Sequence, residues 1–372
     1  MIDKGDHPIT NIYIPDIHTL TRTMKRRNVL RQAGIGLGAV SIAGFAGCMG
    51  ADDEPSDDAD AAAGGEDLTE LDYMIPEGQL DIPMLVAAGE DGTFRDAGID
   101  FRPEITGYGR YARSLTSGDE VVGNVNQDIA ITAWESGDEV TLFGPNLAQF
   151  NLMFAQPGSG IESPADFTED TTIGVPPWAS GTSLLVRTMI LDEYGIDIRE
   201  DTDSTEVDVP ALYELFTEQE EFDVMLQFTG FTVAGLADDI GDVVFDPLEY
   251  WQERTGNPPF VTYFAARTEW LEDNHETAAQ FLEGWENTRS HFDENIDDIM
   301  ARYGLLAGLE TDEQVEVVRE VFEDGVMTTS PENWDDEFID SQWELFELME
   351  ELDIIDMAPP RAEAAISYDE LQ

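Results

Sequence analysis

Short apolar runs alternate with stretches of helical periodicity from Leu71 onward. The apolar runs predict strands over 71–75, 99–104, 128–133, 140–144, 172–175 and 222–227. Helical spacing predicts helices over 80–88, 110–117 and 183–194, and then over the acidic segments 277–291, 296–303, 311–322 and 337–352. Strands that alternate with helices indicate parallel sheets, so the pattern predicts an α/β fold, and no internal repeat is visible.

Residues 1–47 are predicted to form an export signal. Arg26-Arg27 precede an apolar, Gly- and Ala-rich run over 33–46, which is shorter than the about 20 residues of a membrane-spanning helix. The twin arginines resemble the signal of the twin-arginine export route. The small residues before Cys48 resemble a lipobox, in which this cysteine becomes lipidated; a buried thiol is the alternative. Met24 is the expected true start, and a genuine N-terminal extension is the alternative.

The segment that follows is rich in Asp, Glu, Ala and Gly and offers almost nothing to bury. Such a composition predicts a disordered segment. We therefore expect residues 48–70 to tether the folded part to a lipid anchor on Cys48, at the outer face of the cell membrane. Cys48 is the only cysteine, so no internal disulfide can form.

The charge of the chain is extreme, with 80 Asp and Glu residues against 18 Lys and Arg and a formal net charge of −62. Such a charge repels itself and destabilises the compact state in dilute salt. At about 1 M ionic strength the Debye length falls to about 3 Å, which makes the charge tolerable. The composition therefore predicts a protein of a salt-loving archaeon. It also argues against nucleic acid as a partner, because phosphate binding needs Lys and Arg.

Several weak signals along the chain resemble the periplasmic solute-binding proteins of the nitrate/sulfonate/taurine and thiamine-precursor group. The resemblance covers about residues 70–355. It rests on the order and spacing of these signals, and no single one of them is a strong motif. The signals are the opening strand and turn Tyr73–Gly78, Leu115–Gly118, Gly174-Val175 with Ser180–Arg187, Phe222–Val224 and Tyr263–Arg267.

This resemblance implies a type II periplasmic-binding-protein-like fold, in which two α/β lobes are joined by two crossing segments. The crossings are expected near 151–157 and 261–267. The first lobe would then comprise 71–155 plus 265–372, and the second lobe would comprise 156–264. The ligand would bind in the cleft between the lobes.

Two predicted helix starts are candidates for ligand contact. Ser180, Gly181 and Thr182 open a helix after a strand, and its first N–H groups have no internal partner. With the helix dipole, such an end suits a carboxylate, sulfonate or phosphate. A simple N-cap is the alternative. Tyr108 and Gly109 open a first-lobe helix by the same logic.

The cleft loops implied by the resemblance supply the other candidates, which are Glu77, Asn126, Gln127, Trp178, Gln227 and Phe228. Trp178 and Phe228 could hold a flat ring, with core packing as the alternative. Gln227 and Phe228 end a strand at its carboxyl end, where open α/β sheets place ligands. A turn would explain Asn126 and Gln127 equally well.

These features together predict a monomeric solute-binding lipoprotein that closes its lobes on a small molecule and delivers it to an ABC permease with its ATPase. The first choice of ligand is a small organic or inorganic anion such as a sulfonate or nitrate. A heteroaromatic pyrimidine of the thiamine-precursor type is the second. Delivery to a sensor instead of an importer is an open alternative.

An enzyme is the main rival class. The superfamily includes thiamine-pyrimidine synthases that hold pyridoxal phosphate on a lysine, but no lysine follows Cys48. His275 and His291 lie on acidic helices outside the cleft loops, so no base is expected near a nucleophile. Clusters of Cys and His that could bind a metal are lacking in the sequence. We therefore predict no catalytic residue, no cofactor and no metal.

Overall fold

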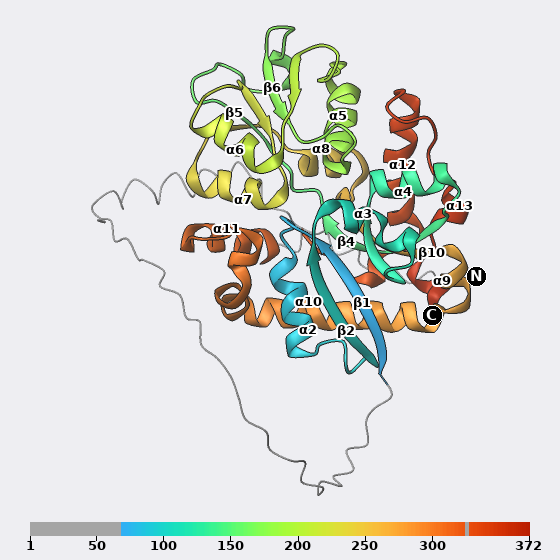
Figure 1. Ribbon diagram of the computed structural model, residues 1–372. Helices are drawn as coiled ribbons and strands as arrows, with labels where there is room; N and C mark the ends of the chain where they lie inside the picture. Colours follow the sequence, from blue (N-terminus) through green and yellow to red (C-terminus); the bar gives the residue numbers. More distant parts are fainter. Residues whose placement is uncertain (1–67, 324–326) are drawn as a thin grey trace, which may run out of the picture. The chain divides into compact units, whose positions relative to one another are not determined.

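The computed structural model describes residues 68–323 and 327–372 (Figure 1). Arg26, Arg27 and Cys48 lie outside these ranges, so the export signal and the lipid anchor remain predictions. Within the described ranges, the helices are too short or too polar to cross a lipid bilayer.

The first lobe contains two small sheets. Strand β1 (Thr69–Pro76) pairs in parallel with β2 (Ile99–Thr106), and α2 (Ile82–Asp91) connects them. In the second sheet, β10 (Phe260–Arg267) lies between β3 (Val122–Asn126) and β4 (Val140–Ala148) and runs antiparallel to both. Helix α3 (Tyr108–Ser117) leads from β2 to β3, and α4 (Gln127–Ser136) connects β3 to β4.

The second lobe, green and yellow at the top of Figure 1, is built on one five-stranded sheet. Its strands in spatial order are β7 (Asp203–Glu206), β6 (Thr172–Val175), β8 (Val224–Leu226), β5 (Met153–Ala155) and β9 (Asp242–Phe245). Its helices are α5 (Gly181–Tyr194), α6 (Val209–Thr217), α7 (Thr229–Asp238) and α8 (Pro247–Thr255), after a 3₁₀ turn at Pro164–Asp166.

The chain changes sheet twice, between Ala148 and Met153 and again between Thr255 and Phe260. Both changes come a few residues before the predicted crossings, because β5 already pairs with β8 and β9, and β10 already pairs with β3 and β4. The predicted parallel pairing is correct for β1 with β2 and for β6 with its neighbours. It is wrong for β5 and β10, the strands that follow the two crossings.

The C-terminal part is helical, as the acidic amphipathic pattern predicts. It comprises α9 (Thr268–Asp273), α10 (His275–Tyr303), α11 (Asp312–Glu323), α12 (Asp336–Glu351), α13 (Arg361–Ala364) and α14 (Tyr368–Leu371), with 3₁₀ turns at Gly304–Ala307 and Pro331–Asn333. The two helices predicted over 277–291 and 296–303 are continuous in α10, but Asn295 has non-helical dihedrals between them. Its side-chain amide donates to the His291 carbonyl at 2.9 Å.

The strand predicted over 128–133 is wrong, because these residues belong to α4. The apolar side chains Ile129, Ala130, Ile131 and Ala133 are all buried. Ile129, Ala130 and Ile131 are consecutive apolar residues, and so short a run shows neither strand nor helix periodicity, so its pattern alone cannot identify the element. Gly137 ends the helix in the left-handed conformation, with φ 78°.

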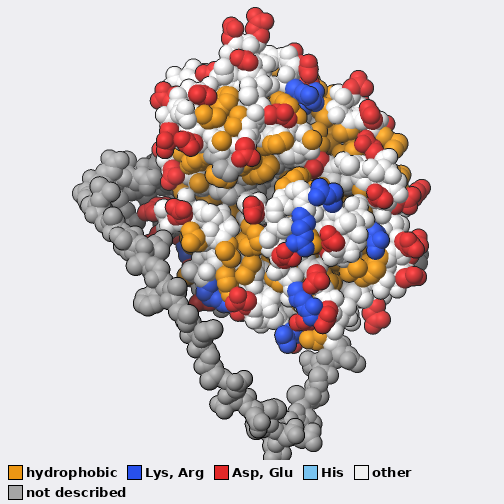
Figure 2. Space-filling view, viewed as in Figure 1, with side chains coloured by type: hydrophobic (Ala, Val, Ile, Leu, Met, Phe, Trp, Pro, Cys, Tyr) orange, Lys and Arg blue, Asp and Glu red, His pale blue; other side chains and the backbone are white. Residues whose placement is uncertain are grey.

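Carboxylates spread over both lobes on the face seen in Figure 2, while most of its arginines lie on the lower half. Arg187 forms a two-pronged ion pair with Asp197, at 2.8 and 2.6 Å, within the second lobe. This arginine is therefore structural.

Two buried carboxyls make stability depend on pH. Neither oxygen of Asp81 makes a hydrogen bond within the described residues, and burial raises the pKa of this carboxyl to about 7 against the opposing effect of its own backbone N–H. Burial likewise raises the pKa of Glu120 to about 7, although Ser114 and the Met74 N–H donate to it. A raised folded-state pKa stabilises the fold at acidic pH, and this stabilisation is lost as pH rises through about 7.

Replacing Asp81 by asparagine removes one of these titrations. The wild type should lose on the order of 2 kcal/mol of unfolding free energy between about pH 5 and about pH 8, because Asp81 ionises in this range. Asp81→Asn should not show this loss. Urea denaturation in molar KCl at a series of pH values measures this difference. The exposed Asp72→Asn is the control and should follow the wild type. Parallel wild-type and Asp81→Asn curves would contradict the prediction.

Candidate functional site

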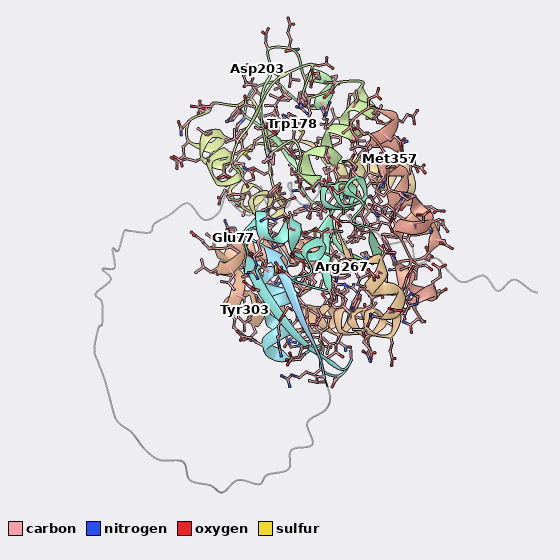
Figure 3. All side chains as sticks on the ribbon, turned by 45° about the vertical axis from the view of Figure 1, so that its right-hand side comes forward. Glu77, Trp178, Asp203, Arg267, Tyr303 and Met357 are labelled. Carbon is pink, nitrogen blue, oxygen red and sulfur yellow. The ribbon has the colours of Figure 1, made fainter. Side chains whose placement is uncertain are left out.

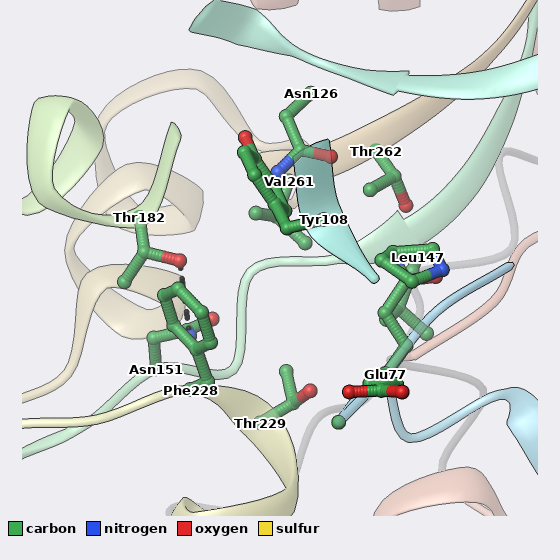
Figure 4. A pocket seen from close by; sticks show the side chains of 13 residues that line it. Glu77, Tyr108, Asn126, Leu147, Asn151, Thr182, Phe228, Thr229, Val261 and Thr262 are labelled. Atoms are coloured by element: carbon green, nitrogen blue, oxygen red, sulfur yellow. Dashed lines mark hydrogen bonds between the residues drawn. The ribbon is translucent and has the colours of Figure 1, made fainter. Parts of the chain in front are cut away.

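A cavity of about 50 Å³ lies where the two lobes meet, and both lobes line it (Figure 4). This volume holds no more than a few water molecules, whereas ligand pockets usually measure roughly 300–1,000 Å³. A larger solute therefore needs the lobes to separate. The lining residues are Pro76, Glu77, Gly78, Gln79, Tyr108, Asn126, Leu147, Asn151, Thr182, Phe228, Thr229, Val261 and Thr262.

The lining comes from element ends on both sides of the cavity. The first lobe supplies the turn after β1, the first residue of α3 and the ends of β3, β4 and β10. The second lobe supplies the first turns of α5 and α7. Figure 4 shows Thr182 and Phe228 on one side and Glu77, Leu147 and Thr262 on the other.

Asn151, in the first crossing, is a buried polar residue of the lining whose side chain is held by hydrogen bonds. Its side chain is 2% exposed, and its amide N–H₂ donates to the Gln227 carbonyl at 2.9 Å and to the Thr182 hydroxyl at 3.2 Å. These two bonds fix the amide orientation. The Oδ1 atom has no hydrogen-bond partner within the described residues. Because a buried acceptor without a partner is costly, Asn151 Oδ1 is a candidate contact for a donor group of a solute.

Asp128 joins the two lobes beside the cavity. One carboxyl oxygen accepts from the Gly181 N–H at 2.9 Å, and the other accepts from the Tyr108 hydroxyl at 2.7 Å. Burial raises the pKa of Asp128 to about 6, and the hydrogen bonds from Tyr108 and Gly181 oppose that shift. The carboxyl of a first-lobe helix therefore binds at the amino end of a second-lobe helix.

Comparison by sequence finds no relative, since neither a family model nor a curated protein matches the chain. Comparison by structure finds proteins of similar fold. The periplasmic aliphatic sulphonate-binding protein of Escherichia coli superposes with a TM-score of 0.64 at 15% identity, covering 81% of this chain and 92% of that one. The chain has the periplasmic-binding-protein fold.

Two further solved structures with the periplasmic-binding-protein fold agree. The alkanesulfonate-binding protein of Xanthomonas axonopodis pv. citri gives a TM-score of 0.62 at 13% identity, over 82% of this chain and 100% of that one. The nitrate-binding protein of Synechocystis PCC 6803 gives 0.56 at 12% identity, over 79% and 84%. The α/β fold predicted from the sequence is therefore confirmed.

Within this periplasmic-binding-protein fold, several residues singled out from the sequence lie together around the interlobe cavity: Glu77, Tyr108, Asn126, Thr182 and Phe228. They come from five separate elements or turns on both lobes. Their shared position keeps each of them a candidate for solute contact.

Other candidate residues do not line the cavity and make hydrogen bonds within the protein instead. Gln127 is fully buried and donates to the Phe260 carbonyl and, at 3.3 Å, to the Tyr263 hydroxyl. Ser180 caps α5 by accepting from the Ser183 N–H at 3.3 Å, which is the alternative role that the sequence allowed.

Gln227 is also buried, and its amide oxygen accepts from the Phe228 N–H at 3.3 Å. Like Gln127 and Ser180, it does not line the cavity. These three side chains support the site through packing and hydrogen bonding.

Trp178, Gly109 and Gly181 lie outside the lining as well. Trp178 belongs to the second lobe, away from Glu77 (Figure 3), and the Arg199 guanidinium lies 5.7 Å from its ring centroid. Gly109 is exposed in the first turn of α3. Gly181 instead makes the interlobe contact with Asp128, and a Cβ on it would lie 2.9 Å from Gln127 Oε1.

Sequence reasoning missed several lining residues, above all Asn151, Thr229 and Thr262. Asn151 and Thr262 lie inside the two predicted crossings, so a polar residue within a crossing was the available signal. Asp128 directly follows the candidates Asn126 and Gln127. Only its contacts with Tyr108 and Gly181 distinguish it from the many other carboxylates of the chain.

Proposed function

We propose that the chain captures a small solute between its two lobes and delivers it to an ABC importer. The observation that carries this proposal is one cavity lined by polar and aromatic side chains from both lobes, in a periplasmic-binding-protein fold. Solved structures similar to it include proteins described as sulfonate- and nitrate-binding, which supports solute binding as the role.

Capture would proceed by lobe closure about the two crossings. Closure brings Thr182 and Phe228 of the second lobe opposite Glu77 and Tyr108 of the first. The return crossing is held by Gln342 of α12, which donates to the Pro258 carbonyl and accepts from the Phe260 N–H, at 2.9 and 3.0 Å. Opening by a permease would remove the contacts of one lobe and release the solute.

The N-terminal segment would place this receptor outside the cell. Export through the Arg26-Arg27 signal and lipidation of Cys48 would anchor it to the outer face of the membrane, and residues 48–70 would act as the tether. Mass spectrometry of the mature N-terminus tests the anchor, because an unmodified Cys48 would rule it out.

The choice between an importer and a sensor concerns the partner rather than the cleft. Loss of solute uptake on deletion of the gene supports the importer. Unchanged uptake with a lost response to the solute would support the sensor. An enzyme remains disfavoured, because no lysine follows Cys48 to hold a pyridoxal phosphate.

The cavity can be tested by binding. A panel of small anions, neutral heteroaromatics and cations is screened by thermal shift in about 2 M KCl, and a ligand at 100 times its dissociation constant should stabilise the protein by about 2.7 kcal/mol. Phe228→Ala is expected to weaken binding of the best ligand by about ten-fold or more, because it removes a ring from the lining.

The control for this experiment is Leu305→Ala, since Leu305 is 71% exposed and does not line the cavity. Equal affinities of the Phe228→Ala variant and the wild type would exclude this cavity as the binding site.

A further inference from the structure

We infer that the solute carries a positively charged, N–H-donating group such as an ammonium or amidinium, and that Asp128 is the specificity-determining residue that excludes anions. The inference rests on the proposed function, because it concerns the same cavity. It departs from the small anion that the sequence favoured.

The first observation is the charge of the lining. Glu77 is the only charged residue among the described residues that line the cavity. The described ranges contain no lysine. Arg110, on the neighbouring helix α3, pairs with Glu104 and does not line the cavity. A bound anion would thus face the Glu77 carboxylate without a compensating cation in the lining, whereas a cation would be attracted by it.

The second observation concerns the donors that an anion would need. Gly181 is the first residue of α5, where free N–H groups and the helix dipole favour an anion. Its N–H is already bound to Asp128, and so is the Tyr108 hydroxyl. The absence of a side chain at Gly181 permits this close approach. Asp128 therefore occupies the position that a carboxylate or sulfonate would take.

The third observation is the buried acceptor on the cavity wall. Asn151 Oδ1 lacks a partner within the described part of the chain, while both bonds made by its amide nitrogen fix its orientation. Only a donor can satisfy it, and an ammonium or amidinium has several N–H groups to offer. Tyr108 and Phe228 contribute aromatic faces to the same cavity, and such faces attract cations.

A matched series of one-ring probes tests the inference: benzamidinium, benzyl alcohol and benzenesulfonate, measured by titration calorimetry in about 2 M KCl. We expect the wild type to bind benzamidinium at least about ten-fold more tightly than benzenesulfonate. Asp128→Ser frees the Gly181 N–H and the Tyr108 hydroxyl. This variant should therefore gain at least about ten-fold in affinity for benzenesulfonate.

The control is Asp138→Ser, which makes the same charge change just beyond the other end of α4, at an exposed position outside the cavity. It should keep the wild-type order of affinities. Asp128→Asn keeps the volume and an acceptor oxygen, and it serves if Asp128→Ser fails to fold. It should reduce the preference for benzamidinium in the same direction.

The outcomes separate the two proposals. Wild-type protein that binds benzenesulfonate as tightly as benzamidinium overturns this inference and leaves solute binding intact. An Asp128 variant that behaves like Asp138→Ser overturns the role of Asp128. If no probe binds and the broader solute panel also gives no ligand, the proposed function fails, and this inference fails with it.

Discussion

Replacing Phe281 by alanine is expected to lower the free energy of unfolding by about 3–5 kcal/mol, the usual cost of removing a fully buried phenylalanine ring. Phe281 lies on α10 and is 0% exposed. Its ring centroid lies 5.9 Å from that of Tyr73 on β1 and 5.0 Å from that of Phe264 on β10. It therefore fills the space between the two sheets of the first lobe.

Thermal or urea unfolding in molar salt measures this loss, which corresponds to a fall in Tm of roughly 5–15 °C. Phe231→Ala is the matched control, because Phe231 is only partly buried and, among the residues that the structure describes, its ring contacts that of Tyr213 alone. It should cost less than half as much. Equal losses for the two variants would mean that α10 does not hold the two sheets together.

Lowering the salt concentration is expected to destabilise the wild-type protein strongly. The whole chain has a net charge of −62, and carboxylates spread over both lobes on the face seen in Figure 2. At about 2 M KCl their repulsion is screened within a few ångströms, whereas at about 0.1 M it extends over about 10 Å. The Tm should therefore fall by roughly 10 °C or more between these two concentrations.

A series of thermal scans at decreasing KCl measures this dependence. Sucrose added at about 0.1 M KCl is the control, because it strengthens burial of apolar surface without screening charge. Sucrose should restore little of the lost Tm. A Tm that changes by only a degree or two across the series would contradict both the repulsion argument and the adaptation to salt that the composition predicts.

The local pattern of hydrophobic and polar residues was sufficient to locate most of the strands and helices. The strands β1, β2 and β6 and the helices α3, α5 and α12 lie where hydrophobic periodicity predicts them, because periodicity reports which face of a segment is buried. The same information could not identify α4, whose run of consecutive apolar residues is too short to show a period. It also could not reveal that β5 and β10 run antiparallel to their neighbours.

The candidate site was likewise predicted only in part from the sequence. Sequence alone marked Tyr108 and Thr182 at helix starts, since such ends expose polar groups, and the family resemblance marked Glu77. Only the tertiary structure decided that Asp128 meets Gly181 across the lobes and that Asn151 retains an unpaired oxygen. Hydrogen bonding between residues far apart in the chain leaves no local periodicity. Which donors and acceptors remain for a solute is therefore fixed only when the two lobes come together.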